Sequence, residues 1–251
     1  MLKTRVVPTL LYKDFGLVKG TAFDSRRAVG SPMQAIKVYE MRGVDELVFF
    51  DVTATANNTG PDFALIDDLA DECFMPFTVG GGVRSVDDVY RLLQVGADKV
   101  CFGTVATTHP EIVGEATRRF GSQSIVVAID VRRDHAGVRV TRCSGQEDTE
   151  FDPVQFARMM EDAGVGELIV QSVDRDGSMD GYDLDILSAI CSAVSIPVVA
   201  SGGAGTYEHL RQAITESDAS AVAAASMFHF THQTPQAAKE YLAEHGIAVR
   251  L

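Results

Sequence analysis

The sequence predicts an α/β protein whose fold is a (βα)8 TIM barrel built from two repeated half-barrels. Three observations lead to this prediction: an internal repeat, eight short apolar segments, and helical patterns between successive segments. Strands covered by helices on both faces are apolar throughout, whereas strands with one solvated face alternate between apolar and polar residues. The eight segments are apolar throughout, so we expect each of them to be a parallel strand.

The internal repeat relates the two halves of the chain in the same order. GVDELVFFDV, which begins at residue 43, resembles GVGELIVQSV at residue 164, and MPFTVGGGV at residue 75 resembles IPVVASGGA at residue 196. GADKVCFGTV at residue 96 matches DASAVAAASM at residue 218. A similar separation places Leu11 on Asp130 near the start of each half. Each half is therefore expected to contribute four strands.

The expected strands alternate with helices along the chain. They cover residues 5–11, 46–51, 76–80 and 98–103 in the first half, and 124–130, 167–172, 196–201 and 220–225 in the second. Between them, SVDDVYRLLQVGA and DPVQFARMMEDAGVG have helical spacing. Ser85 and Asp152 fit as N-caps, and Gly96 and Gly164 fit as helix stops. A doubly wound open sheet is the alternative, but it does not require four repeated strands in each half. No linker divides the chain, so we expect one domain over residues 1–251.

Composition excludes several classes of protein. The net charge is −13 and no basic stripe is present, which argues against a nucleic-acid partner. No apolar run is long enough to span a bilayer, and MLKTRVV lacks a signal-peptide pattern, so we expect a cytoplasmic protein without a membrane partner. The four cysteines form no CxxC pair and the six histidines form no ligand motif, so no disulfide framework, metal site or cofactor is expected.

Active residues of such barrels lie at the carboxyl ends of the strands and in the loops that follow. Small residues follow the third, fourth, seventh and eighth strands, where backbone N–H groups can approach an anion. The candidates for phosphate binding are Gly82, Gly103, Thr104, Gly203 and Ser226. Two such sites on opposite sides of one barrel mouth predict a ligand with a phosphate at each end. The alternative is that these glycines only form tight turns.

Other candidates lie between the two phosphate loops. Asp130 ends the fifth strand and suits a general acid or base, with a structural carboxylate as the alternative. Asp51, Asp176 and Gly177 follow the second and sixth strands and are expected to contact substrate, with a structural role for Asp174 or Asp176 in holding a turn as the alternative. Lys19 lies in GLVKGTAFDSRRAVG, which we expect to be a loop that closes over a ligand, although a solvated lysine is the other interpretation.

Charged residues also occur at the starts of four expected strands. They are Arg5, Glu46, Lys99 and Glu167. At the amino-terminal face of a barrel they would form a ring. Such a ring is either a salt-bridged plug that stabilises the barrel or a gate that admits a small polar molecule.

Seven segments make the chain similar to the HisF family, the cyclase subunits of imidazole glycerol phosphate synthase. The segments are DELVFFDVTA, PFTVGGGV, GADKV, FGSQSIVVAID, DRDGSMDGYD, ASGGAG and the FHF at 228–230. The resemblance extends from Met1 to Leu251 and is more specific than any single glycine loop.

The resemblance implies a lyase-type cyclase of histidine biosynthesis. A glutaminase subunit (HisH-like) would dock on the amino-terminal face, and its ammonia would pass through the barrel. The substrate would be a bisphosphorylated ribulosyl-formimino aminoimidazole carboxamide ribonucleotide, converted to imidazole glycerol phosphate and aminoimidazole carboxamide ribonucleotide (AICAR). The family's gate matches Arg5, Glu46, Lys99 and Glu167, and Asp98 matches an acidic residue used in glutaminase docking.

The chain departs from the family at two positions of the site. The family's catalytic aspartates end the first and fifth strands; Asp130 matches the second, but Leu11 stands in place of the first. Losing such a group costs roughly 10²–10⁴-fold in rate. Tyr12 is adjacent but should point away from the mouth. Gly103 stands where the family usually has Asn.

These departures leave a second function open. PTLLYKDFGLVK, ECFMP and SAVAA are similar to a paralogous branch found with lipopolysaccharide-sugar amidotransferases. A member of that branch would channel ammonia to a separate synthetase and have little cyclase activity.

Overall fold

Each expected apolar segment forms a parallel strand, and the eight strands close into a barrel. In the computed structural model, which describes residues 3–14, 16–135 and 137–251, every strand pairs with the next, and β12 pairs back with β1. The barrel strands are β1 (Arg5–Lys13), β4 (Leu47–Asp51), β5 (Phe77–Gly80), β6 (Lys99–Phe102), β7 (Ile125–Asp134), β10 (Glu167–Ser172), β11 (Val198–Ser201) and β12 (Ala221–Ala224). The closing pair excludes an open sheet and confirms the predicted barrel. The predicted extent of 1–251 includes residues 1, 2, 15 and 136, which lie outside the described residues.

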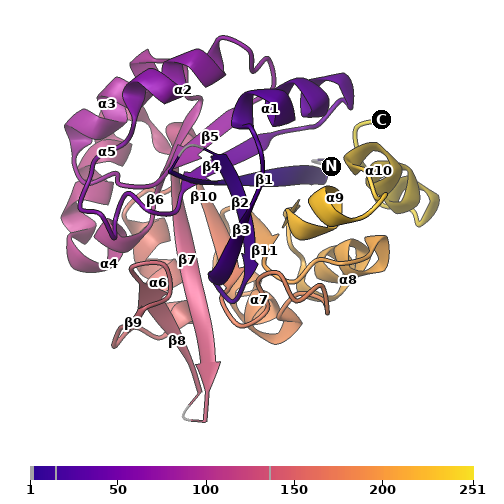
Figure 1. The fold of residues 1–251 in the computed structure, drawn as a ribbon. Helices are drawn as coiled ribbons and strands as arrows, with labels where there is room; N and C mark the ends of the chain where they lie inside the picture. Colours follow the sequence, from indigo (N-terminus) through magenta and orange to yellow (C-terminus); the bar gives the residue numbers. More distant parts are fainter. Residues whose placement is uncertain (1–2, 15, 136) are drawn as a thin grey trace.

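Helices surround the barrel between successive strands (Figure 1). They are α1 (Pro32–Met41), α2 (Phe63–Ala70), α3 (Val86–Gln94), α5 (Pro110–Phe120), α6 (Pro153–Asp162), α7 (Leu184–Cys191), α8 (Tyr207–Ser217) and α10 (Pro235–Glu244), with the short α4 (Thr104–Thr108), α9 (Ser226–Phe230) and the 3-10 turn η1 (Ser122–Ser124). The expected caps are present. The Ser85 hydroxyl accepts from the Asp88 N–H at 3.1 Å, and Asp152 accepts from two N–H groups at 3.0 Å. Gly96 and Gly164 have φ values of 102° and 88°, which favour glycine where a helix ends.

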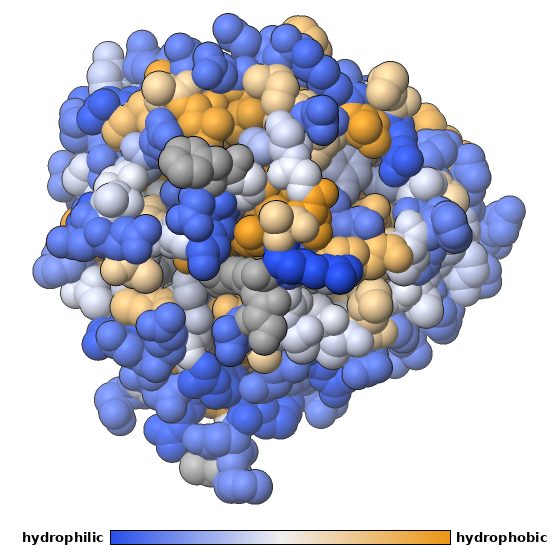
Figure 2. All heavy atoms as spheres, viewed as in Figure 1, coloured by the Kyte–Doolittle hydropathy of each residue, from blue (hydrophilic) through white to orange (hydrophobic). Residues whose placement is uncertain are grey.

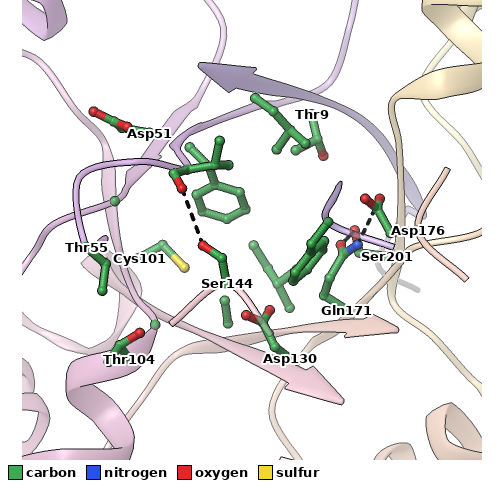
Figure 3. A pocket seen from close by; sticks show the side chains of 18 of the residues that line it. Thr9, Asp51, Thr55, Cys101, Thr104, Asp130, Ser144, Gln171, Asp176 and Ser201 are labelled. Carbon is green, nitrogen blue, oxygen red and sulfur yellow. Dashed lines mark hydrogen bonds between the residues drawn. The ribbon is translucent and has the colours of Figure 1, made fainter. Parts of the chain in front are cut away.

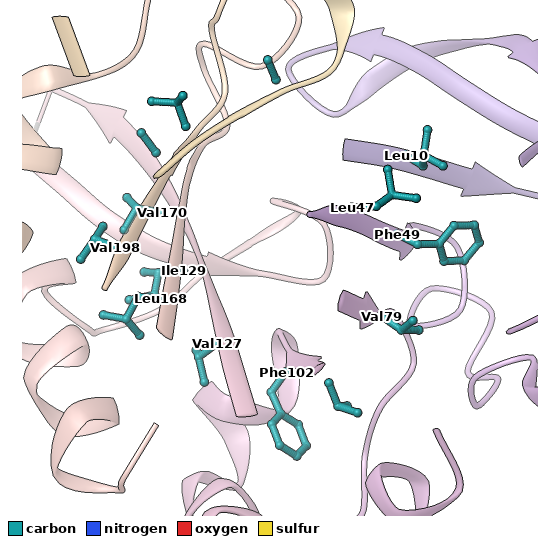
Figure 4. Packing of buried hydrophobic residues seen from close by; sticks show 14 of the residues in the cluster. Leu10, Leu47, Phe49, Val79, Phe102, Val127, Ile129, Leu168, Val170 and Val198 are labelled. Atoms are coloured by element: carbon teal, nitrogen blue, oxygen red, sulfur yellow. The ribbon is translucent and has the colours of Figure 1, made fainter. Parts of the chain in front are cut away.

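The main core lies between the outer face of the barrel and the helices. Figure 4 shows Leu10, Phe49, Phe102 and Leu168 among the side chains that fill this layer. All four are at most 1% exposed, and burying one such side chain stabilises the fold by about 1.5–3 kcal/mol. Because the outward residues of each strand alternate with inward ones, the same strands also supply the interior of the barrel.

A second apolar cluster fills the interior. It consists of Val7, Val48, Cys101, Val126, Ile169, Val199, Ala221 and Ala223, with Phe50 and Ala128 packed against it. Most of these residues are small, so the interior narrows around apolar side chains between the strand starts and the strand ends. The apolar interior therefore separates the charged residues at the strand starts from the polar residues at the strand ends.

Two antiparallel extensions were not expected from the sequence. The segment after β1 is a hairpin of β2 (Gly16–Thr21) and β3 (Asp24–Gly30), not an irregular loop, and β7 continues into β8 (Gly137–Arg142) and β9 (Glu147–Asp148). The β2–β3 turn places Ala22 and Phe23 at φ values of 48° and 64°. Such turns usually carry Asn-Gly or Asp-Gly, so the residues at this turn gave no hairpin signal.

Figure 2 shows hydrophilic residues over most of the outer rim in this view, with hydrophobic patches nearer the centre. Among the described residues, no helix is both long enough and apolar enough to cross a bilayer.

Candidate active site at the barrel mouth

The carboxyl ends of the strands surround a cavity of about 550 Å³. Every residue predicted to bind substrate or phosphate lines this cavity, although several come from distant parts of the chain. They are Lys19, Asp51, Gly82, Gly103, Thr104, Asp176, Gly177, Gly203 and Ser226, together with the catalytic candidate Asp130. Figure 3 shows the polar side chains converging on the same space. The structure therefore brings the predicted set together around one cavity.

Asp130 lies on the inner side of β7 where that strand reaches the mouth. Part of the Asp130 side chain is accessible from the cavity, and the rest of it is enclosed by the barrel wall. Burial, with a smaller contribution from the nearby charge of Asp176, raises the pKa of Asp130 to about 7. A carboxyl group that titrates near neutral pH is suited to both giving and accepting a proton.

Leu11 lines the same cavity from β1. In the strand order of the barrel, β1 and β7 are four strands apart, so they lie on opposite sides of the mouth. Tyr12 points the other way, as expected: its ring packs 5.5 Å from that of Phe49 in the outer core. The wall opposite Asp130 is therefore apolar at the position that the repeat makes equivalent.

Asp51 holds the loop after β4. Its Oδ1 accepts hydrogen bonds from the Thr53 N–H and hydroxyl, both at 2.8 Å, and from the Ala54 N–H at 3.0 Å. This local arrangement fixes the loop backbone beside the first glycine segment. Asp51 thus shapes the cavity wall, and turning it toward a substrate would break these bonds.

Gln171 was missed in the sequence. It lies beside Asp130 in the register of β7 and β10, and beside Ser201 in the register of β10 and β11. Its Oε1 accepts from the Ser201 hydroxyl, and its Nε2 donates to the Asp176 carboxylate at 3.2 Å. The repeat aligns Gln171 with Phe50, another cavity residue, so the repeat was the signal that could have identified it.

The glycine loops repeat in conformation as well as in sequence. Gly82 and Gly203 have φ values of 71° and 109°. A Cβ at Gly82 would lie 2.8 Å from the Ala54 Cβ, and one at Gly203 would overlap the Gly181 carbonyl. Both positions therefore require glycine because neighbouring segments of the chain pack directly against them, whether or not an anion binds. Among the described residues, no protein acceptor is found for the backbone N–H groups of Gly82, Thr104, Gly203 and Ser226.

Gly103 differs from these glycines. A Cβ added there would have no atom within 4 Å, and its φ is −117°. Neither close packing nor a left-handed backbone requires glycine at this position. The absence of a side chain instead widens the cavity next to Thr104.

The β2–β3 hairpin lies along one side of the mouth. Lys19 on β2 is 3% exposed and lines the cavity, so the interpretation as a solvated lysine is wrong. The Ala22 N–H at the hairpin turn donates to the Asp176 carbonyl at 2.8 Å. Gly177 packs so closely on the Gly20 carbonyl that no Cβ would fit between them. The predicted covering segment is thus held against the loop after β10.

The four charged residues at the strand starts form a closed ring of ion pairs. Arg5 pairs with both Glu46 and Glu167, and Lys99 lies 2.8 Å and 2.7 Å from the same two carboxylates. Burial raises the pKa of Glu167, but hydrogen bonding and charge from Arg5 and Lys99 outweigh burial and lower it overall. Thr78, also missed in the sequence, donates to Glu46 at 2.9 Å.

Asp98 lies next to this ring, at the same end of the barrel. Its side chain is exposed, and one carboxylate oxygen accepts the Phe77 N–H at 2.8 Å. The residue is therefore accessible from the amino-terminal face, as docking would require. Its role as a contact with a partner remains a prediction.

Comparison with known proteins agrees with the geometry. The family model described as "Histidine biosynthesis protein" matches residues 5–234. Over 253 aligned residues, the chain is 46% identical to the "Imidazole glycerol phosphate synthase subunit HisF" of Caulobacter vibrioides (strain NA1000 / CB15N). That match covers 100% of this chain and 97% of the relative.

Proposed function

The chain belongs to the histidine biosynthesis protein family, and we propose that it is the barrel subunit of a glutamine-dependent imidazole glycerol phosphate synthase in the cytoplasm. In this proposal it uses ammonia from a glutaminase subunit to convert a bisphosphorylated ribulosyl-formimino aminoimidazole carboxamide ribonucleotide to imidazole glycerol phosphate and AICAR. The observation that carries the proposal is the position of Asp130, between two repeated glycine loops at one barrel mouth.

The bond changes of this reaction set the demands on the site. The ammonia nitrogen must become bonded to two carbons, the ketone carbon of the ribulosyl unit and the formimino carbon. The ketone oxygen leaves as water, and the amine of AICAR leaves from the formimino carbon. Ammonia must lose protons while both leaving groups gain them, so the site needs groups that transfer protons at neutral pH. Asp130 meets this need because burial raises its pKa to about 7.

The repeat supports a ligand with two phosphates. Backbone N–H groups of Gly82 and Thr104 would hold one phosphate, and those of Gly203 and Ser226 would hold the other. Lys19 would contribute a cation from the covering hairpin, which Gly177 contacts at Gly20. Holding both ends fixes the reacting carbons of the substrate between the loops, near Asp130.

The ring of Arg5, Glu46, Lys99 and Glu167 would act as the gate for ammonia. Its ion pairs close the amino-terminal end, and the interior beyond it is lined by small apolar side chains. Such a lining favours neutral ammonia over ammonium, because an unpaired charge is costly to bury. The glutaminase would dock on the exposed side of this ring, with Asp98 as one contact.

A steady-state assay tests the proposal. The purified chain would be mixed with the bisphosphorylated substrate and a saturating ammonium salt, and both products would be measured by chromatography. We expect equal amounts of imidazole glycerol phosphate and AICAR, formed only when ammonium is present. Substrate binding without turnover at any ammonium concentration would overturn the proposal.

A second candidate function is favoured by Leu11. A barrel that lacks one of the two carboxylates could channel ammonia from a glutaminase to a separate sugar amidotransferase, with little cyclase activity of its own. This candidate predicts glutaminase binding, no product in the assay above, and a second HisF with both aspartates in the same genome. The ammonium-dependent assay therefore separates the two candidates.

A further inference from the structure

The proposed reaction requires proton transfer at more than one atom, but β1 supplies no carboxylate at the mouth, where Thr9 and Leu11 line the cavity. Three carboxylates line the cavity among the described residues: Asp51, Asp130 and Asp176. Asp51 is committed to its own loop by three hydrogen bonds through one oxygen. A search for the partner of Asp130 therefore leads to Asp176.

Gln171 places Asp176 near Asp130. Strand register puts Gln171 directly beside Asp130, and its Nε2 donates to the Asp176 Oδ1 at 3.2 Å. The Ser201 hydroxyl donates to the Oε1 of the same amide, which fixes its orientation, because the amide nitrogen must then face the carboxylate. In Figure 3, Gln171 lies between the two acids. The backbone of Asp176 is also fixed, since its carbonyl accepts the Ala22 N–H.

We infer that Asp176, held by Gln171, is the second proton-transfer group of this site and forms a carboxylate pair with Asp130 in place of the acid that β1 lacks. The inference rests on the proposed function. It assigns chemistry to a residue whose alternative role is to bind a substrate hydroxyl or hold a turn. Gln171 acts through Asp176 and is a positioning residue.

Asp130 and Asp176 together can supply and remove every proton needed in the first two steps of the proposed reaction, the addition of ammonia to the ketone and the loss of water. When ammonia adds to the ketone carbon, ionised Asp176 accepts a proton from nitrogen, and protonated Asp130 gives one to the ketone oxygen. The proton then passes from Asp176 to Asp130, which restores the starting state. A second transfer from nitrogen to the hydroxyl oxygen releases water and leaves a carbon–nitrogen double bond. Each step moves one proton from nitrogen to oxygen, and the pair returns unchanged.

The electrostatics support this division of roles. Burial is the main cause that raises the pKa of Asp130, and the charge of Asp176 adds to it. Two carboxylates in one site that differ in environment separate into an acid and a base. The other charged or titratable groups that line the cavity are Lys19, Asp51, Arg84, Cys101 and His109.

The substitution Asp176→Asn separates a chemical role from a structural one. The asparagine side chain still offers an oxygen to the Gln171 amide but cannot take a proton. Asp174→Asn is the matched control: Asp174 lies on the same loop, accepts the Arg133 N–H at 2.7 Å, and does not line the cavity. Gln171→Met keeps the length of the side chain and removes the amide that holds Asp176.

Cyclase rates with saturating ammonium salt would be measured for the parent and the three variants between pH 5 and 9. We expect Asp176→Asn to lower kcat by roughly 10²–10⁴-fold with little change in KM, and Asp174→Asn to match the parent. Gln171→Met should lower kcat less and shift the pH profile. An Asp176→Asn variant that turns over at the parent rate would overturn the inference and leave the proposed function intact.

A second measurement does not depend on turnover. Carbon-13 NMR of the labelled aspartate carboxyl groups follows the titration of Asp130 in the parent and in Asp176→Asn. Removing the neighbouring charge should lower the pKa of Asp130, because the two groups titrate as a pair. If the parent has no cyclase activity, the proposed function fails, and this titration still decides the pair. An Asp130 titration that is identical in both proteins would overturn it.

Discussion

Leu11 and Asp130 face the same cavity from strands on opposite sides of the barrel. β1 carries the leucine and β7 carries the carboxyl group, at positions that the internal repeat makes equivalent. The two half-barrels therefore keep the same backbone plan but differ in chemistry at this pair. The remaining acid, Asp130, lies on the same side of the mouth as Gln171 and Asp176.

Asp130→Asn should abolish cyclase activity without unfolding the barrel. The asparagine amide has nearly the same shape as the carboxyl group but cannot act as an acid or a base at neutral pH. Activity with saturating ammonium salt and the circular dichroism spectrum would be compared with those of the parent. Turnover at the parent rate in a folded variant would show that Asp130 is not the acid or base.

The same variant should be more stable than the parent at alkaline pH. The folded pKa of Asp130 is raised from 3.8 to about 7, so its contribution to stability is complete below about pH 4 and is lost as pH rises through about 7. Each pK unit corresponds to about 1.4 kcal/mol. Urea unfolding at pH 5 and pH 8 should show the variant gaining in free energy of unfolding, relative to the parent, as pH rises. A pH-independent difference would contradict the raised pKa.

Leu11→Asp should restore a carboxyl group opposite Asp130. If Asp176 has taken the place of this acid, as inferred above, ammonia-dependent turnover should rise only slightly, and a rise of roughly 10²–10⁴-fold would show that Asp176 does not fill the role. Leu11→Asn is the control, because it adds polarity without a titrating group. A parent that already turns over as fast as Leu11→Asp would show that the acid on β1 is dispensable, which the pair of Asp130 and Asp176 would explain. An inactive parent together with an inactive, folded Leu11→Asp variant would favour the channelling candidate.

The barrel and most of its site could be predicted because the sequence repeats its own chemistry. The uninterrupted apolar segments predicted all eight strands. The carboxyl ends of those strands then predicted the positions of Asp130 and both glycine loops at the cavity. The charged ring followed from the same logic at the strand starts, and its four members do pair. Strand order was enough here because barrel topology determines which strand ends meet.

The hairpin after β1 and the environments of Gln171 and Lys19 could not be predicted, because they depend on contacts between segments that are distant in the sequence. The hairpin after β1 turns at Ala22 and Phe23, neither of which is typical of a left-handed turn. Gln171 ends an apolar strand and resembles a solvated edge residue until its partners Ser201 and Asp176 are located. Lys19 is buried only because the hairpin folds against the loop after β10. Each miss arises from tertiary contacts between distant loops.

Gly103→Asn should strengthen anion binding in the first half of the mouth. Space is available for the side chain, and an amide would add a hydrogen-bond donor beside Thr104. Crystals of parent and variant soaked in phosphate should show density at both glycine loops, with higher occupancy near Thr104 in the variant. Gly103→Ala is the control, because it adds a side chain at the same open position without a hydrogen-bond donor. Density at neither loop in the parent would count against a bisphosphate ligand.

Lys99→Met tests whether the charged ring is a gate or only a plug. Methionine keeps an apolar stem but removes both ion pairs of Lys99, so that Glu46 and Glu167 keep their ion pairs with Arg5 only. Removing one partner of a buried pair costs up to about 3–5 kcal/mol, so chemical unfolding should show a clear loss of stability. The control Arg211→Met removes an exposed pair with Glu208, which solvent screens, so the free energy of unfolding should change little. If the ring is a gate, glutamine-dependent turnover in the complex with a glutaminase should change relative to ammonium-dependent turnover of the same variant. If both rates fall in proportion to the folded fraction, the ring serves stability alone.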